Sequence, residues 1–364
     1  MGRCRVTNAV RWRMTAEPLD GLPVESTWSV TNVDAAFGLR SAVACGDRLG
    51  EGPVWDGTAE ALWWLDVKGR FVSCFQPATG LAQRWALPSS PGCIALPAPC
   101  LGFDDPIIAL PAGLAVFDPQ TLALNPFGAE GPVVDEQNRC NDGRVDRQGR
   151  LWVGTMDDPE ERRSGSLYCV TAAAADIGSA RPSVVRWTHQ FGDVGVPNST
   201  CFSANGSVMY WADSWDRTIW AFDIDPVEPR ITNRRVLATI AGDAVPDGAT
   251  VDADDHVWCC LWDGWCVVRF RPDGTVERTV PLPVQRPTCP AFGGDDLATL
   301  SVTTAQHNLT AQQLRSQPLA GNLLSVDAGS AFGVRGLPEG RFGPVSRPAS
   351  GTPSSQSING TTDP

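Results

Sequence analysis

The chain of 364 residues carries a formal net charge of −12, and Lys68 is the only lysine among its 29 basic residues. An acidic chain without a basic run argues against nucleic acid and anionic membranes as partners, and it is compatible with a cation site. No apolar run approaches the length of a membrane span, and the N-terminal residues lack the apolar core of a secretory signal.

The 12 cysteines bear on the compartment in which the protein works. None of them forms a C-x-x-C pair, and only Cys259 and Cys260 are adjacent. This spacing is neither a zinc motif nor the disulfide framework of a small secreted domain. We therefore expect reduced, mostly buried thiols in a cytoplasmic protein, whose oligomeric state the sequence leaves open.

One pattern recurs through most of the chain: an aromatic or β-branched strand, a turn rich in Asp or Gly, and a second strand. Residues 1–35 lack it, and we expect an irregular N-terminal extension there. Residues 343–364 are rich in Pro, Ser, Gly and Thr, which predicts a disordered tail. The six copies of the pattern cover residues 61–80, 107–121, 150–170, 208–225, 256–276 and 296–327.

The copies recur about every 40 to 55 residues, which is the spacing of propeller blades built from four short strands. No stretch has the period of a long amphipathic helix, and this argues against a parallel sheet with crossover helices. We predict an all-β fold, a six-bladed β-propeller that occupies residues 36–342. A large β-sandwich is the alternative.

Four polar motifs precede or separate these copies. LGEGPVW contains Glu51, RCNDG contains Arg139 and Asn141, VPNSTCF contains Asn198, and VPDGATV contains Asp247. Successive motifs lie about two, one and one blade lengths apart. If they are loops near the axis, their side chains converge on the central channel. Each motif also fits an ordinary turn, and the Asn-Asp-Gly of RCNDG in particular fits a hairpin turn.

The side chains in these motifs are a set of oxygen ligands. The carboxylates of Glu51 and Asp247 with the amide oxygen of Asn198 suit Ca²⁺, Mg²⁺ or Mn²⁺. Such a set leaves coordination positions open for water and substrate. Asp158 and Glu160, in the acidic turn that follows RLWVGTM, are candidates for the channel mouth.

LGEGPVW, RCNDGRVDRQGRLWVGTM, VPDG and RPTCPAFGGDDLATLSVTTA together resemble the senescence marker protein-30/gluconolactonase/luciferin-regenerating enzyme family. The resemblance covers roughly residues 46–342, and the ending QPLAGNLLSVDAGSAFGVRGLPEGRF resembles the bacterial sugar-lactonase branch. Members of that family are six-bladed β-propellers with one divalent cation in the channel, and many of them hydrolyse sugar lactones.

The resemblance implies that Glu51, Asn198 and Asp247 are metal ligands, and it leaves the ion open among Ca²⁺, Zn²⁺, Mg²⁺, Mn²⁺ and Fe²⁺. It also implies that Arg139 and Asn141 contact the hydroxyls or the carbonyl of the lactone. One position departs from the family: the metal-binding Asn is usually followed by Gly, and here a serine follows it. A residue other than Gly there restricts the backbone angles.

We predict a metal-dependent hydrolase that converts a sugar aldono-lactone, such as gluconolactone or arabinono- or xylonolactone, to the aldonic acid. The ion would polarise the ring carbonyl and activate a water. Asp247 is the predicted catalytic residue, which steers or deprotonates that water. Arg139 and Asn141 would orient the substrate and stabilise the oxyanion.

Two alternatives remain open from the sequence. The first is a non-catalytic calcium-binding or regulatory propeller. The second is an esterase with a catalytic serine, which has little support because the three histidines lie outside the polar motifs and no G-x-S-x-G occurs.

Overall fold

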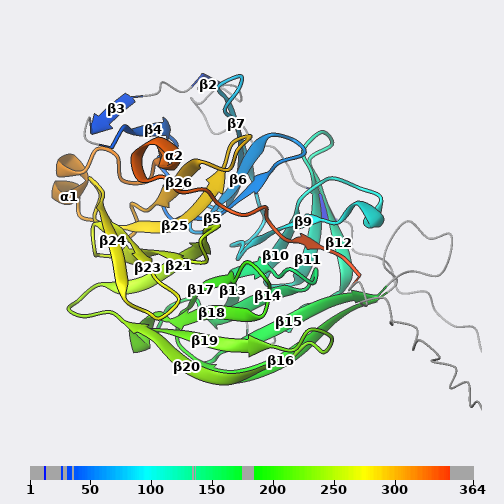
Figure 1. Ribbon diagram of the computed structural model, residues 1–364. Coiled ribbons are helices and arrows are strands. Elements are labelled where there is room, and N and C mark those ends of the chain that lie inside the picture. Colours follow the sequence, from blue (N-terminus) through cyan, green and yellow to red (C-terminus); the bar gives the residue numbers. More distant parts are fainter. Residues whose placement is uncertain are drawn as a thin grey trace, which may run out of the picture.

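Six antiparallel sheets surround a central axis (Figure 1), and the predicted all-β, six-bladed propeller is confirmed. The computed structural model describes residues 12–13, 26–27, 31–34, 37–132, 135, 137–173 and 184–344. Among these residues no helix is long and apolar enough to cross a membrane. All eleven described cysteines are free thiols, nine of them buried, while the cytoplasmic location stays a prediction.

Each blade has four principal strands, which follow one another from the axis outward. The blades are β5 (Gly50–Asp56), β6 (Ala61–Asp66), β7 (Phe71–Gln76), β8 (Leu81–Ala86); β9 (Ile94–Pro97), β10 (Ile107–Leu110), β11 (Gly113–Asp118), β12 (Ala123–Glu130); β13 (Asn138–Val145), β14 (Leu151–Asp157), β15 (Gly165–Ala173), β16 (Val184–Val194); β17 (Pro197–Phe202), β18 (Val208–Asp213), β19 (Thr218–Ile224), β20 (Ile231–Thr239); β21 (Val245–Val251), β22 (Val257–Trp262), β23 (Cys266–Phe270), β24 (Val276–Pro281); and β25 (Pro287–Gly293), β26 (Thr299–Thr304), β27 (Leu323–Asp327), β4 (Leu39–Val43).

Four short strands and four helical segments complete the described elements. They are β1 (Trp12–Arg13) on β12, β2 (Ser26–Thr27) on β8, β3 (Thr31–Asp34) on β4, β28 (Arg341–Phe342) on β9, η1 (Pro99–Leu101), η2 (Ser214–Asp216), α1 (Ala311–Ser316) and α2 (Ala328–Phe332). The predicted domain limits at residues 36 and 342 stay predictions, and residues 345–364 of the predicted tail lie outside the described part of the chain.

The six repeat copies correspond to the two middle strands of each blade. These strands are covered on both faces by neighbouring blades, and for this reason they are rich in large apolar residues. β6, for example, is buried along its whole length. The inner strands contact their neighbours around the axis, in the order β5, β9, β13, β17, β21, β25 and back to β5.

Hydrogen bonds among buried Asp, Trp and Arg side chains connect the strands within several blades. In one blade Asp146 accepts hydrogen bonds from the indole Nε1 of Trp152 at 2.8 Å and from Nε of Arg150 at 2.6 Å. Because all three side chains are buried, the carboxylate is stable there only with these donors in place. The same arrangement of an aspartate with an indole and a guanidinium occurs at Asp252, Trp258 and Arg269, and at Asp47, Trp64 and Arg84.

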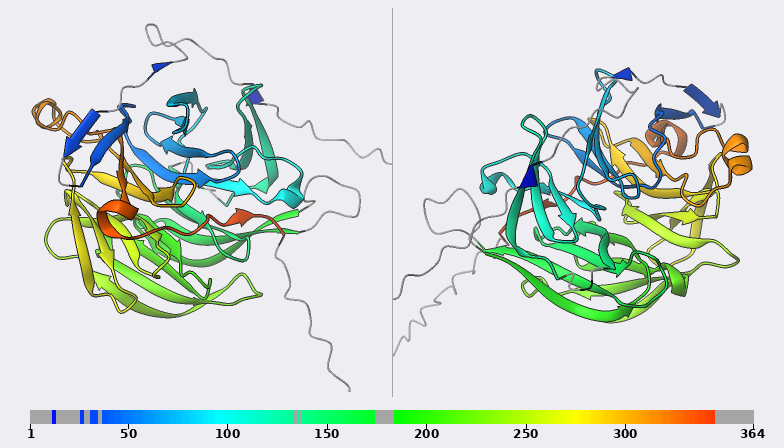
Figure 2. Two further views of the ribbon diagram at one scale, coloured as in Figure 1. Left: turned by 45° about the horizontal axis from the view of Figure 1, so that its top comes forward. Right: turned by 180° about the vertical axis from the view of Figure 1, so that it is seen from behind.

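The segment after α2 crosses the face at which the inner strands end (Figure 2). Its β28 pairs in parallel with β9, and Glu339 forms an ion pair of 2.5 Å with Arg144 near the end of β13. Arg147 donates to the carbonyl oxygen of Pro338. The segment therefore links separate blades on that face.

The N-terminal part of the chain closes the ring. β4 pairs with β27, with Val43 opposite Leu323 and Ser41 opposite Leu324, so that the last blade takes its fourth strand from before the first blade. This pairing joins the two ends of the propeller without a covalent bond.

Shortened chains test this closure. A chain that starts at residue 37 keeps β4, and we expect its melting temperature to stay within a few degrees of that of the full chain. A chain that starts at residue 45 loses the burial of Leu39 and Val43, roughly 1.5–3 kcal/mol each. Its melting temperature should fall by about 10 °C or more, measured by circular dichroism. Equal melting of the two chains would show that β4 does not hold the ring closed.

Candidate active site

A β-bulge interrupts each inner strand that carries a predicted site residue. In β5 the pairing with β6 skips from Glu51 to Val54, so that two residues of β5 face one residue of β6. β13, β17, β21 and β25 show the same shift in register. The expectation that these motifs are loops or hairpin turns is wrong, because their turn-forming residues occupy bulges within strands. A bulge bends the strand and re-aims its side chains, here toward the axis.

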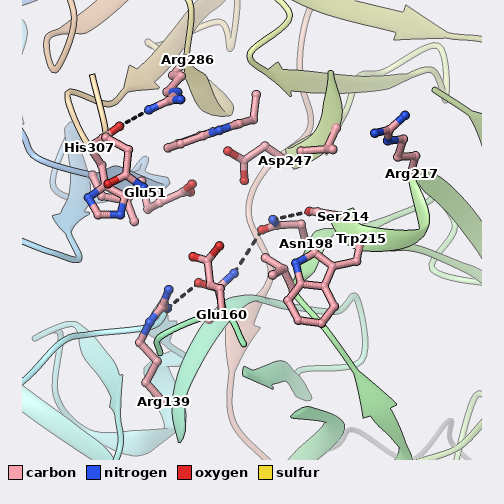
Figure 3. Close-up of a pocket in the computed structure, with 16 residues that line it drawn as sticks. Glu51, Arg139, Glu160, Asn198, Ser214, Trp215, Arg217, Asp247, Arg286 and His307 are labelled. Atoms are coloured by element: carbon pink, nitrogen blue, oxygen red, sulfur yellow. Dashed lines mark hydrogen bonds between the residues drawn. The ribbon is translucent and has the colours of Figure 1, made fainter. Parts of the chain in front are cut away.

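A cavity of about 360 Å³ lies at the face where the inner strands begin. It brings together all five predicted site residues and Glu160 (Figure 3). Asp158 reaches this region through a hydrogen bond to Arg139. The complete lining is Leu49, Glu51, Arg139, Asn141, Glu160, Val196, Asn198, Ser214, Trp215, Arg217, Val245, Asp247, Trp262, Arg286, His307 and Asn308.

The carboxyl groups of Glu51 and Asp247 face each other within hydrogen-bonding reach. Burial, with the charge of Asp142, raises the pKa of Glu51 to about 8. Burial and the charge of Glu51 hold the pKa of Asp247 well above its ordinary value. Asp247 is buried and Glu51 half-buried, and a positive charge beside them would stabilise the ionised forms of both carboxyl groups.

Asn198 turns its amide oxygen toward the same place. Its Nδ2 donates to Oγ of Ser214 at 2.9 Å, and this hydroxyl donates to the carbonyl oxygen of Pro246 at 2.7 Å. The hydroxyl proton is committed to Pro246, so the amide nitrogen must face Ser214. The oxygen of Asn198 therefore points away from η2. On that other side Nδ2 of Asn141 donates to it at 3.3 Å.

The donor set fits a hard divalent cation. Glu51 and Asp247 would provide the charge and Asn198 a neutral oxygen, and this composition is typical of Ca²⁺ and related ions. In the described part of the chain no three His, Cys, Asp or Glu side chains group together as metal ligands.

Arg139 is held rigidly beside these groups. Its Nε donates to Asp158 at 2.6 Å, and its Nη1 donates to Oδ1 of Asn141 at 2.6 Å. Lys68 donates to the same Asp158 oxygen at 2.8 Å. Burial opposes ionisation of Asp158, but Lys68 and Arg139 outweigh it, and the pKa of this carboxyl lies below its ordinary value. The guanidinium is thus fixed by a fully ionised partner.

Asn141 connects Arg139 to the carboxylate side of the cavity. Its Oδ1 accepts from Arg139, and its Nδ2 donates to the carbonyl oxygen of Pro197 at 2.9 Å. Both polar atoms of the amide are therefore engaged within the protein. The residue lines the cavity as predicted, but its bonds position Arg139 and Asn198.

Ser199 occupies the position where the family usually has glycine, and its backbone is in the left-handed region with φ of 57°. Its Oγ donates to the carbonyl oxygen of Asp247 at 2.5 Å. The hydroxyl therefore ties the bulge of β17 to the bulge of β21. This bond offsets the backbone strain that a side chain causes at such an angle.

Several residues of the site were not identified from the sequence. Asp142 is buried directly behind the cavity, where it accepts from the backbone N–H of Thr200 at 2.7 Å and contributes to the raised pKa of Glu51. Trp215 lies in η2 and Trp262 ends β22, while Arg217, Arg286 and His307 come from turns between strands. Trp215, in the short helical turn after β18, was the available signal, because large aromatic residues are unusual in turns.

Similar sequences among known proteins identify the family. A sequence profile described as "SMP-30/Gluconolactonase/LRE-like region" matches residues 49–306. The chain belongs to the SMP-30/gluconolactonase/luciferin-regenerating enzyme family. It is 34% identical to a 6-deoxy-6-sulfogluconolactonase of Pseudomonas putida over 78% of this chain and 92% of that protein. It is 32% identical to an L-arabinolactonase of Azospirillum brasilense over 76% and 87%.

A solved structure supports the family assignment. A calcium-binding protein, regucalcin, from Agrobacterium tumefaciens superposes with a TM-score of 0.73 and 29% identity, over 85% of this chain and 98% of that one. Membership of the SMP-30/gluconolactonase family, with named lactonases among the relatives, makes this protein a hydrolase that acts on lactone esters.

Glu51→Gln tests whether the facing carboxyl groups destabilise the metal-free protein. The substitution keeps the shape and removes one repelling group. We expect the protein in chelator to gain about 1–2 kcal/mol, the order of an unsatisfied buried polar group, while the rise in melting temperature on adding Ca²⁺ or Mn²⁺ is lost. Differential scanning calorimetry measures both. A variant that is less stable in chelator and still stabilised by the ions would contradict this account.

Substitution of Ser199 separates its hydrogen bond from its backbone angle. Ser199→Ala removes the bond to the Asp247 carbonyl and keeps the strain, so we expect a loss of about 1 kcal/mol. Ser199→Gly removes the same bond and relieves the strain, and we expect it to be the more stable of the two variants. Thermal melting of both gives the order, and the reverse order would show that φ at this position carries no strain.

Proposed function

We propose that the protein hydrolyses a sugar aldono-lactone with the help of a divalent cation bound by Glu51, Asn198 and Asp247. The facing carboxyl groups of Glu51 and Asp247 support this most directly, because two carboxyl groups side by side in one cavity are the charged oxygen ligands that a hard divalent cation takes. The relatives act by name on different sugar lactones, which supports this substrate class without selecting one member of it.

The cation would supply positive charge for the ring carbonyl oxygen and for a water molecule in the cavity. Asp247, with one carboxylate oxygen to spare, accepts the proton of the attacking water. A new C–O bond forms at the ring carbonyl carbon, and the ester bond to the ring oxygen breaks. That oxygen takes up the proton and leaves as a hydroxyl, so that lactone and water together give the aldonic acid.

Arg139 stabilises the charge that develops on the carbonyl oxygen. Among the described residues, its Nη2 is the guanidinium nitrogen without a hydrogen-bond partner, and the residue lines the cavity. Because Asp158 and Asn141 fix the other nitrogens, this donor is oriented before the substrate binds. Asn141 acts through Arg139 and Asn198, which makes it a positioning residue in this scheme.

Arg139→Ala is the experiment that tests these roles. We expect metal content, measured by elemental analysis, to stay near that of the wild type, while kcat/KM for gluconolactone falls about 10²-fold, the scale of one preorganised donor. Arg139→Lys should recover part of the rate, because it keeps the charge and loses the planar fork.

Paired measurements on the same preparations decide the outcome. Loss of metal together with rate would place Arg139 in the support of the cation site. Wild-type protein that binds Ca²⁺ but hydrolyses none of a panel of pentono- and hexono-lactones, with each of several divalent ions, would favour a calcium-binding propeller. The resemblance to regucalcin keeps that alternative open.

A further inference from the structure

Three guanidinium groups line one cavity of a chain whose net charge is −12. Two of them have carboxylate partners: Arg139 pairs with Asp158 at 2.6 Å, and Arg286 pairs with Asp263 at 2.6 Å. The third, Arg217, forms no ion pair with any residue that the structure describes. Its guanidinium lies exposed to water at the cavity rim, with no carboxylate of the described residues to neutralise it.

The acidic residues closest to Arg217 along the chain are already engaged. Asp213 and Asp216 both pair with Arg163, at 3.0 and 2.5 Å. Arg217 itself donates one bond through Nη1, to the carbonyl oxygen of Gly242. Within the described residues its Nε and Nη2 have no partner, and a guanidinium offers five N–H donors in total. Most of its hydrogen-bonding capacity is thus available at the cavity.

The backbone holds Arg217 in a defined place. It is the C-cap of η2, its φ is 52°, and its N–H donates to the carbonyl oxygen of Ser214 at 3.1 Å. The left-handed region is costly for a residue with a long side chain. The same turn carries Ser214, which orients Asn198. One turn therefore positions both the predicted cation ligand Asn198, through Ser214, and the backbone of Arg217.

We propose that Arg217 selects a lactone that carries a negatively charged group, phosphate, sulfonate or carboxylate, at the end of the molecule remote from the ring carbonyl. This rests on the proposed lactonase function. In the view of Figure 3, Arg217 lies on the other side of Asp247 from Glu51, so a carbonyl held near the carboxyl groups leaves the far end of the substrate toward Arg217. Glu160, drawn near Arg139 in the same view, disfavours the reverse orientation of an anion.

Charge explains why an anion suits this rim better than sugar hydroxyls. A bound substrate that covers Arg217 removes water from the guanidinium, and neutral hydroxyls would leave the cation without a counter-charge. An anionic group restores the lost solvation and accepts charge-assisted, bidentate hydrogen bonds. The indole of Trp215, two positions earlier, adds an apolar wall to the same rim.

The test compares glucono-1,5-lactone with 6-phosphogluconolactone as substrates. We expect wild-type kcat/KM to favour the phosphorylated lactone at least about 10-fold, and this ratio should fall as ionic strength rises. Arg217→Gln should lower the ratio about 10- to 100-fold, the range for a hydrogen bond between charged groups, and Arg217→Lys should lower it less. The 6-sulfonate and the 6-carboxylate in place of the phosphate show which anion fits the rim best.

Arg234→Gln is the matched control. Arg234 lies in the same blade, stacks on Trp220 at 4.5 Å and lies outside the cavity lining, so its loss changes the net charge equally. The ratio should stay at the wild-type value in this variant. A wild-type ratio near one, or an equal fall in both arginine variants, overturns the assignment to Arg217.

Product binding separates this inference from the proposed function. Isothermal titration calorimetry with 6-phosphogluconate and gluconate needs no turnover, and we expect tighter binding of the phosphorylated product, lost in Arg217→Gln. If neither lactone is hydrolysed but this preference holds, the lactonase proposal fails while the anion site stands. If both lactones are hydrolysed but neither the rate nor product binding depends on the phosphate, the anion site fails while the lactonase proposal stands.

Discussion

The contact between the carboxyl groups of Glu51 and Asp247 is the constraint on which the rest of the site depends. β5 and β21 are not neighbours in the ring, since β25 lies between them. The two groups meet only because six blades close around an axis and each inner strand bends at a bulge. The raised pKa values of both groups mean that ionising them together is costly, and a bound divalent cation would stabilise the ionised forms.

A continuous set of hydrogen bonds keeps the groups around this contact in place. It runs from Arg139 through Asn141 to Asn198, and on through Ser214 to the backbone of β21. Ser199 adds a second link between β17 and β21. Three inner strands thus hold the side chains of Arg139, Asn141 and Asn198 in fixed orientations. A catalytic site depends on such fixed geometry. The serine in the glycine position is therefore part of this support, and its hydroxyl contributes a bond that glycine could not.

The two faces of the propeller differ in the elements that cover them. On one face the segment after α2 links the blades, through β28 and the ion pair of Glu339 with Arg144. On the other face η2, the end of β22 and the turns between strands carry the aromatic and cationic residues of the cavity rim. The cavity opens on this face, and the turns around its mouth are where lactones can be distinguished without disturbing the carboxyl groups below.

The sequence by itself determined the blade number, the family and the five predicted site residues that meet in the cavity. The reason is physical: strands covered on both faces need aromatic and β-branched residues, so each blade repeats the same pattern at its two middle strands. Polar residues spaced by whole blades must then converge, as Glu51, Asn198 and Asp247 do. The tertiary structure alone decided that these residues lie in bulged strands and that Asn141 supports its neighbours. It also decided that Arg217, among the described residues, has no acidic partner of the kind that Arg139 and Arg286 have. Such pairings depend on which turns meet across blades, and spacing along a chain carries no information about them.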